Sequence, residues 1–297
     1  MFYEYALDPA VLSSWERVRY FLDAFGPWKG RFLAEYPRRW RKLVYDGLRC
    51  NAVERTRIEE RLRRLDERVF SRRPGSTFNG KRPWLDNAEA EHERSAFRAI
   101  IALETRGKDY ILDGSVVDET EERWRVEQGC ILPRDPLNFV HALGLLLRES
   151  SHVVMIDPYF RADQPDKTSP LTTLCQVFQT ANVQIEIHGS EKDLAYAEVI
   201  RHAKRALPDA IPEEMKVLLR CWKERPGGAR LHNRFLLTDI GGVQFGDSIE
   251  RGEPSHEDRL AIVDEPSHKA LWAQYVGSPA AFDEAGPPCQ FTGRKRH

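Results

Sequence analysis

Apolar residues in the first part of the chain recur at the three-to-four-residue spacing of helices. Asp8-Pro9 has the N-cap-then-proline order of a helix start. The apolar residues that follow at this spacing are Leu12, Trp15, Val18 and Leu22. A second stripe, set among the Arg and Glu residues of 54–70, comprises Ile58, Leu62, Leu65 and Val69. With a further helix expected over 87–104 and a turn-rich loop over 71–83, the pattern predicts a mainly α-helical domain over residues 1–130.

From residue 135 onward, short apolar runs alternate with segments of helical spacing. The continuous run 153–156, ended by Pro158, is typical of a buried strand. Further strands are expected over 183–189, 216–222, 231–238 and 258–265. Helices are expected over 135–147, 170–180, 191–206 and 267–277. This alternation predicts an α/β domain over residues 131–280, and the segment 281–297 is expected to be a disordered tail.

Composition narrows the class of protein. The chain has 297 residues, of which 41% are hydrophobic and 31% are charged, as in a globular protein with a charge-rich surface. No apolar run approaches the ~18 residues that a membrane-spanning helix needs, and the first residues lack the order of a signal peptide. The five cysteines are scattered without a CxxC pair, so we expect a cytoplasmic protein without a structural zinc site or a disulfide framework.

The net charge of −1 conceals an uneven distribution. Residues 15–82 contain 19 Lys/Arg and 9 Asp/Glu, whereas the rest of the chain contains 26 and 37. A basic N-terminal part indicates a surface for a polyanion or another partner. The alternative is that the basic and acidic parts neutralise each other at an internal interface.

The basic aromatic run 26–45, GPWKGRFLAEYPRRWRKLVY, has two interpretations. Its cations could track a nucleic-acid backbone while its aromatic rings stack on bases, and the candidate binding residues are Arg38, Arg39, Arg41 and Lys42. Alternatively, the run contains a helix that buries Trp40, Leu43 and Val44 and leaves its arginines solvated or paired with Glu. We slightly favour the helix, and a contact with a protein partner would give the same pattern.

Candidate chemistry concentrates in residues 230–249, RLHNRFLLTDIGGVQFGDSI. Side chains on a strand alternate between faces, so His232 and Arg234 share one face and Asp239 lies on the other. Gly241-Gly242 is expected to allow the positive φ of a tight hairpin, which returns residues 246–248 close to His232. An imidazole beside a guanidinium is suited to phosphate chemistry, since Arg binds phosphate oxygens and His can attack phosphorus or transfer a proton.

The spacing His232-x-Arg234-x4-Asp239-x6-Gly246 resembles the H-x-K-x4-D-x6-G-S-x-N (HKD) motif of the phospholipase D-like superfamily. With the upstream IDPYF segment (156–160), the chain is similar to the phospholipase D-like domain that follows microtubule-interacting-and-trafficking (MIT) domains, and to its bacterial relatives. The resemblance covers about residues 135–275. It implies an α/β phospholipase D-like domain, preceded here by the mainly α-helical basic domain.

The resemblance implies a hydrolase, namely a metal-independent phosphodiesterase without a cofactor and most plausibly a nuclease. His232 would form a phosphohistidine in one subunit and act as the acid in the other, while Arg234 would stabilise phosphorane oxygens. Because the chain has one copy of the motif, a homodimer is expected. By family analogy, the chain is expected to serve as an effector of an antiviral defence or restriction system.

The chain departs from the motif at Arg234, Asp247 and Ile249, where the family has Lys, Ser and Asn. Ser248 is the candidate for the missing catalytic hydroxyl, and the expected supporting residues are Asp239, Gly246, Asp247 and Glu257. The carboxylate that orients His232 could be Glu250, Glu257 or Asp258.

Three rival interpretations remain. His232 and Arg234 could simply pair with an opposite carboxylate on a surface strand. Asp157 with Glu186 and His188 faintly echoes the acidic motif of metal nucleases, although His is a poor substitute for Lys there. Finally, the domain could have lost its chemistry and serve as a module that binds nucleic acid, acidic lipid or a protein partner.

Overall fold

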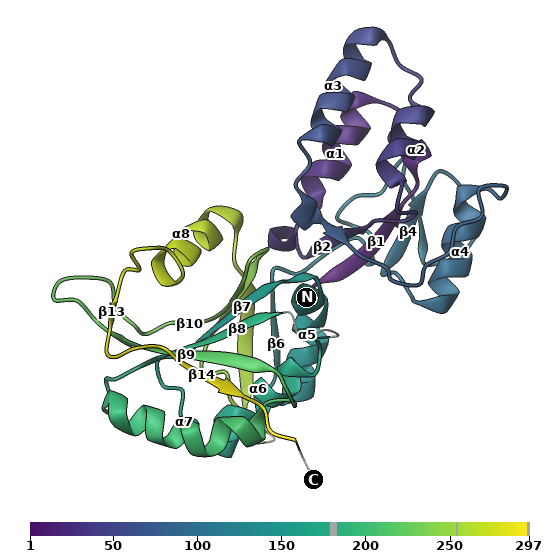
Figure 1. Cartoon of the computed structure of the whole chain (residues 1–297). Helices are drawn as coiled ribbons and strands as arrows, with labels where there is room; N and C mark the ends of the chain where they lie inside the picture. Colours follow the sequence, from purple (N-terminus) through teal and green to yellow (C-terminus); the bar gives the residue numbers. More distant parts are fainter. Residues whose placement is uncertain (179–182, 254, 296–297) are drawn as a thin grey trace. The chain divides into compact units, whose positions relative to one another are not determined.

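The structure is a computed structural model that describes residues 1–178, 183–253 and 255–295. The chain divides into two compact units, Phe2–Glu127 and Gln128–His297, each with its own sheet (Figure 1). Among the described residues, no helix is both long and apolar enough to cross a membrane.

The N-terminal unit contains a five-stranded parallel sheet of order β3-β2-β1-β4-β5. Its strands are β1 (Tyr3–Leu7), β2 (Arg31–Ala34), β3 (Phe70–Ser71), β4 (Ala99–Ala102) and β5 (Ile111–Asp113). Its helices are α1 (Trp15–Ala24), α2 (Trp40–Gly47), α3 (Ala52–Arg63) and α4 (Trp84–Arg94), with 3-10 turns η1 (Pro9–Val11), η2 (Pro27–Lys29) and η3 (Glu67–Val69).

Helices cover both faces of this sheet. Residues of α1, α2 and α3, such as Phe21, Trp40 and Leu62, pack with Leu33 and Ile101 in one core. Leu85 of α4 belongs to a second core with residues whose side chains leave the sheet on the opposite face. The prediction of a mainly α-helical domain is therefore wrong, because the unit has an α/β architecture. Its strands are two to five residues long, and those at its centre are buried on both faces, so they lack the alternation that identifies a strand.

The C-terminal unit contains a mixed sheet of order β13-β9-β8-β7-β10-β11-β12-β6, in which β14 also pairs with β9. Its strands are β6 (Gly129–Pro133), β7 (His152–Ile156), β8 (Gln184–Ser190), β9 (Lys216–Lys223), β10 (Arg234–Thr238), β11 (Gly242–Phe245), β12 (Glu257–Ile262), β13 (Asp283–Glu284) and β14 (Cys289–Thr292). Its helices are α5 (Pro136–Glu149), α6 (Pro165–Cys175), α7 (Tyr196–Ala210) and α8 (Glu265–Tyr275).

Within this sheet, β7, β8 and β9 are parallel, whereas β10, β11, β12 and β6 follow as antiparallel neighbours. Helix α8 covers one face through Leu271 and Trp272, which pack on Ile156 and Phe235. Figure 1 shows α6 and α7 on the side of the sheet opposite α8. The carboxyl ends of β7 and β11 and the amino end of β10 therefore meet at one edge, which is where the candidate site lies.

Two expectations for this unit need correction. The segment 281–297 is not a free tail over its described part, because β13 and β14 pair with β9, with Cys289 opposite Leu219 and Asp283 opposite Lys223. The helix expected over 170–180 instead spans 165–175 as α6, and residues 179 and 180 lie outside the described residues. Cys289–Thr292 was missed because a four-residue strand gives too short a pattern to recognise.

Candidate functional site

The candidate site gathers three segments that are distant in sequence. Ile156 pairs with Phe235, and Arg234 pairs with Phe245. The residues after β7 (157–159), those just before β10 and those after β11 (246–248) therefore reach the same edge of the sheet.

His232 is exposed and has a phenol as its neighbour. Its Nδ1 lies 3.2 Å from the hydroxyl of Tyr159, and the two rings meet edge to face. The Tyr159 backbone N–H donates to the Asp157 carboxylate at 3.0 Å, which fixes the tight turn after β7. One polar partner thus holds one ring nitrogen of His232.

Arg234 lies against the same tyrosine. Its guanidinium carbon is 4.7 Å from the centre of the Tyr159 ring, a cation–π distance. Its Nε is buried and has no hydrogen-bond partner among the described residues. Tyr159 therefore brings together the two residues that the sequence pattern pairs.

His232 and Arg234 do not come together through the strand alternation that the sequence predicted. Strand β10 begins at Arg234, so His232 lies in the loop before the strand, and strand alternation does not set its direction. None of the three carboxylates considered as orienting groups forms a hydrogen bond or ion pair with His232. Glu250 contacts Lys167, Asp258 accepts backbone N–H groups, and Glu257 is an exposed residue of β12.

Ser248 belongs to a buried polar cluster. The Lys167 ammonium, carried by α6, donates to Ser248 Oγ and lies 3.6 Å from Asp157 Oδ2. Ser248 Oγ in turn donates to Asp157 Oδ2 at 3.2 Å. Ser248 is 4% exposed and Asp157 is fully buried, so the hydroxyl has its partners within the protein rather than at an open surface. Lys167 is a site residue that the sequence reasoning missed.

Asp247 and Glu250 complete this cluster through a second buried cation. Arg134, in the segment between β6 and α5, forms ion pairs with Asp247 Oδ2 at 2.7 Å and with Glu250. Burial raises the pKa of Glu250, but the Lys167 ammonium and the Arg134 guanidinium outweigh it and hold that pKa below its usual value. The charge of Asp247, which would repel a phosphate, is thereby partly compensated.

Asp258 fixes the backbone after β11. Its Oδ1 accepts the N–H groups of Gly246, Asp247 and Arg259 at 3.1, 3.0 and 2.7 Å. Burial raises the pKa of this carboxyl despite those donors. The predicted supporting role of Gly246 has a steric basis, because a Cβ there would come within 3.1 Å of Asp258.

Asp239 lies at the far end of β10, away from His232. Its carboxylate accepts the backbone N–H of Ser151 at 3.0 Å and that of His152 at 3.2 Å. The hairpin beside it does not use glycine in the expected way, because neither Gly241 nor Gly242 has a positive φ. Gly242 is needed for space, since a Cβ there would lie 2.7 Å from Leu237 Cδ2.

The basic aromatic run of the N-terminal unit separates into two groups. Trp40 is fully buried and donates its indole N–H to the Leu7 carbonyl at 2.6 Å, so it cannot stack on a base. Arg41 pairs with Glu67, and Lys42 pairs with Asp46. The remaining candidates of this run, Arg38 and Arg39, are exposed. The helix interpretation is therefore confirmed for Trp40 and Val44, which are buried on α2, whereas Leu43 is half-buried.

Asp157 and Glu186, paired in the metal interpretation, belong to separate networks. Glu186 accepts from His152 at 2.9 Å, His188 at 3.2 Å and Arg220 at 2.7 Å, on the face that α8 covers. Burial raises the pKa of Glu186, but these three partners outweigh it and hold the pKa far below its usual value. Within the described residues, no three His, Cys, Asp or Glu side chains are grouped so as to hold a metal ion.

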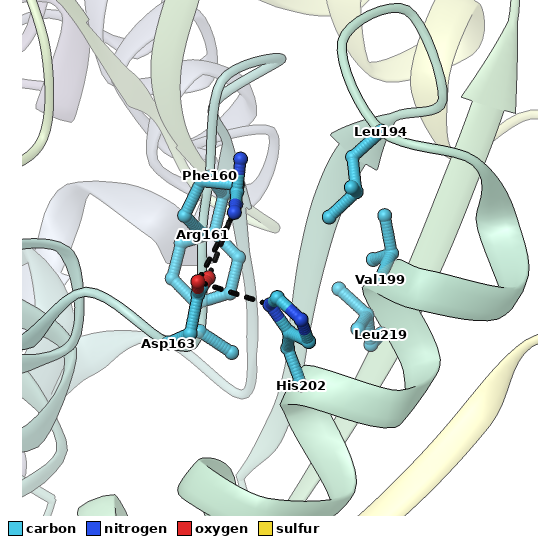
Figure 2. Close-up of a pocket in the computed structure, with 8 residues that line it drawn as sticks. Phe160, Arg161, Asp163, Leu194, Val199, His202 and Leu219 are labelled. Atoms are coloured by element: carbon cyan, nitrogen blue, oxygen red, sulfur yellow. Dashed lines mark hydrogen bonds and ion pairs between the residues drawn. The ribbon is translucent and has the colours of Figure 1, made fainter.

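Two cavities accompany these networks in the C-terminal unit. Figure 2 shows the smaller, about 10 Å³, where Asp163 lies between Arg161 and His202, 3.0 Å from each. The Arg161 guanidinium lowers the pKa of Asp163 to about 2, with burial opposing and His202 assisting. This volume holds about one water molecule, too little for a substrate.

The larger cavity, about 560 Å³, lies beside Glu186 and is lined by Arg220, Trp222, Tyr275 and residues 276–280 and 282–284 among others. Its charged groups pair with one another: Arg220 with Glu186 and Glu284, and Arg225 with Asp283. Its size suits a small molecule, but its compensated charges indicate no particular class of ligand.

Comparison with known proteins gives little guidance. No family model and no curated protein matches the chain. A solved structure of TrmBL2, described as an archaeal chromatin protein with a novel mode of DNA binding, is similar at 13% sequence identity and a TM-score of 0.29. The similarity covers 54% of this chain and 55% of that one, so the chain spans about half the length of that protein. A likeness this low assigns neither fold nor function.

Proposed function

We propose that this protein is a metal-independent phosphodiesterase of the phospholipase D-like type, a nuclease that acts as a homodimer through His232. The observation that carries the proposal is the grouping of His232, Tyr159 and Arg234. An exposed imidazole with one nitrogen held by a phenol lies beside a guanidinium whose Nε has no partner among the described residues.

Tyr159 determines which nitrogen of His232 can react. When Nδ1–H donates to the phenol oxygen, the lone pair of the neutral ring is on Nε2. Nε2 attacks phosphorus, the bond from phosphorus to the leaving oxygen breaks, and that oxygen takes a proton from the imidazolium of the second subunit. Water then breaks the P–N bond, giving its hydroxyl to phosphorus and a proton to the second imidazole.

Arg234 supplies the charge stabilisation in this scheme. Its guanidinium remains protonated throughout and donates several N–H groups toward non-bridging phosphate oxygens. Its stacking on the Tyr159 ring restricts its orientation before substrate arrives. The motif's lysine would offer a point charge without this stacked geometry.

A cleavage assay in excess EDTA tests the proposal. The purified chain is incubated with plasmid DNA, single-stranded DNA and RNA, and with bis(4-nitrophenyl) phosphate as a small diester. Cleavage that persists in EDTA and is lost in His232→Ala is the expected result. Absence of cleavage by a protein shown to be dimeric would contradict the proposal. Cleavage that needs added metal would favour the metal-nuclease interpretation of Asp157 and Glu186 instead.

A second candidate function is binding without turnover. It is favoured by the state of Ser248 and Asp247, whose side chains are engaged by Lys167 and Arg134. Such a domain would recognise a phosphate-bearing ligand through Arg234 and His232 alone. Affinity for a diester that depends on Arg234, with no hydrolysis, would distinguish it from the enzyme.

A further inference from the structure

Two loops of the N-terminal unit bring four exposed cations to one edge of the parallel sheet. Residues 35–39 follow β2 and residues 72–83 follow β3, and these neighbouring parallel strands end at the same edge. Arg38 and Arg39 come from the first loop, and Lys81 and Arg82 from the second. All four are exposed, and none of their side chains forms an ion pair with another described residue. We call these four residues the loop cations.

Buried hydrogen bonds hold the two loops together. Tyr36 is 1% exposed, and its hydroxyl lies 2.8 Å from the Thr77 carbonyl oxygen and 2.9 Å from that of Asn87. The Asn87 side chain binds the second loop by accepting from the Asn79 N–H at 2.7 Å and donating to the Pro83 carbonyl at 2.9 Å. Lys81 and Arg82 therefore project from a loop whose backbone is already ordered.

The positive charge at this edge is not compensated locally. Elsewhere in the same unit, cations have acidic partners, as in Arg41–Glu67 and Arg61–Asp23. Residues 72–83 contain four basic residues and no acidic one, and the acidic residue in 35–39 is the half-buried Glu35. Arg73 pairs with Glu4 and Glu91, and Arg72 also has a partner, so the uncompensated charge of the second loop is that of Lys81 and Arg82. Helices α2 and α4 begin directly after these loops without a side-chain N-cap bond, so their amino ends add partial positive charge.

The surroundings of the loop cations favour a duplex over a single strand. Non-specific binding of single strands depends on exposed aromatic rings that stack on bases. Tyr36 and Trp40, which flank Arg38 and Arg39, are buried. Phe78 and Trp84, which flank Lys81 and Arg82, are half-buried and pack against the core around Tyr36 and Leu85. Among the described residues, the one Phe, Tyr or Trp side chain that is exposed is that of Tyr20, and it lies on α1. The groups that remain at this edge are one lysine ammonium and three arginine guanidinium groups, which are suited to binding phosphates.

We propose that the loop cations bind the phosphate backbone of double-stranded nucleic acid, without reading its bases, and so deliver the substrate of the C-terminal unit. The inference rests on the proposed function in taking nucleic acid as substrate. It also changes the set of nucleic-acid-binding residues expected from the sequence. Arg38 and Arg39 remain in the set, Arg41 and Lys42 leave it, and Lys81 and Arg82 join it.

The test measures binding by the full-length chain carrying His232→Ala, in EDTA, to a short DNA duplex, the matching RNA duplex and each single strand, at several salt concentrations. The test variant changes all four loop cations to Gln. The control variant changes Arg19, Arg49, Arg57 and Arg63 to Gln, which removes the same charge from exposed positions on or next to α1 and α3. Circular dichroism and thermal melting verify that each variant is folded.

We expect the test variant to lose affinity for duplex at least tenfold near physiological salt. The slope of log affinity against log salt should become shallower by about 3 to 4, since each neutralised phosphate contributes about 0.9. The control should keep both the affinity and the slope. Equal losses in the two variants, tighter binding of single strands than of duplex, or no binding by the parent chain would overturn the inference.

The small diester separates this inference from the proposed function. Bis(4-nitrophenyl) phosphate needs no extended surface, so its hydrolysis should depend on His232 and be unaffected when the four loop cations are changed to Gln in a chain that retains His232. Loss of duplex binding with no hydrolysis of the diester would leave the inference standing and contradict the enzyme. Hydrolysis of the diester by a chain that binds no duplex would support the enzyme and contradict this inference.

Discussion

The hydroxyl of Tyr159 lies 3.2 Å from Nδ1 of His232, although the two residues are 73 positions apart in the chain. The tyrosine follows β7 and the histidine precedes β10, and the pairing of those strands makes the contact. A phenol is neutral, so it orients the imidazole without the strong stabilisation of the imidazolium that a carboxylate would give. Tyr159 is therefore a positioning residue for His232 in the proposed reaction.

Replacing Tyr159 by Phe tests this positioning role. The variant loses the hydrogen bond but keeps the ring beneath Arg234, so we expect kcat to fall a few-fold to about tenfold, as for the loss of about 1 kcal/mol, while KM changes little. Tyr159→Ala also removes the stacked ring and should raise KM. Steady-state rates on the small diester across a pH series measure both effects, and an unchanged kcat in Tyr159→Phe would exclude the role.

Ser248 and Lys167 are expected to contribute to stability rather than to touch substrate. Ser248→Ala removes one hydroxyl from a cluster that keeps the ion pairs of Lys167, so the free energy of unfolding should fall by about 1 kcal/mol. Lys167→Met leaves buried Asp157 without its cation and should cost roughly 3–5 kcal/mol. Urea unfolding measures both. A Ser248→Ala protein of normal stability that no longer cleaves the diester would show that Ser248 is catalytic.

Asp239 should prove to be a structural anchor. Asp239→Ala leaves the N–H groups of Ser151 and His152 without their acceptor, and we expect a loss of roughly 1–3 kcal/mol in the free energy of unfolding. Asp239→Asn retains an acceptor oxygen and should lose less. Because this residue lies at the opposite end of β10 from His232, rates on the small diester should be normal in both variants, and a selective loss of rate would contradict the assignment.

The cluster around Glu186 predicts acid sensitivity. Burial lowers the pKa of His188 in the folded state, so stability should begin to fall as the pH drops below about 6.5, where the unfolded histidine takes up a proton. The pKa of Glu186 is depressed below its usual 4.5, so its contribution is present above that value and is lost at lower pH.

Urea unfolding at a series of pH values measures this dependence. Glu186→Gln should be destabilised near neutral pH by roughly 3 kcal/mol, because Arg220 and the two histidines lose a charged partner. Its stability should also change less than that of the parent below pH 4.5. A parent chain whose stability is constant from neutral pH down to 4 would contradict the assignment.

The central strands of the C-terminal unit could be placed from the sequence because β7, β8 and β9 have five, seven and eight residues and lie between segments of helical spacing. The run 153–156 lies within β7, and 183–189 and 216–222 fall almost entirely within β8 and β9. In the N-terminal unit, β2 and β4 have four residues each, too few for their pattern to be distinguished from that of a neighbouring helix. The sheet there was missed for that reason.

At the candidate site, local sequence identified the pair His232 and Arg234 but not what surrounds it. Spacing within one segment carries information about neighbours along the chain, whereas Tyr159, Lys167 and Arg134 arrive from three other segments. Ser248 has the residue type expected of a catalytic hydroxyl. Its burial depends on a lysine 81 residues away, which no local pattern reveals.

The pairing of β13 and β14 with β9 has a consequence for solubility. β9 has eight residues, with β8 on one side, and the other side is covered by the short strands of the C-terminal segment. Without them, its N–H and C=O groups would form an open edge, which recruits strands from other molecules and promotes aggregation. A chain shortened before residue 281 should therefore self-associate even if its remaining fold is intact, so C-terminal deletions are a hazard in preparing this protein.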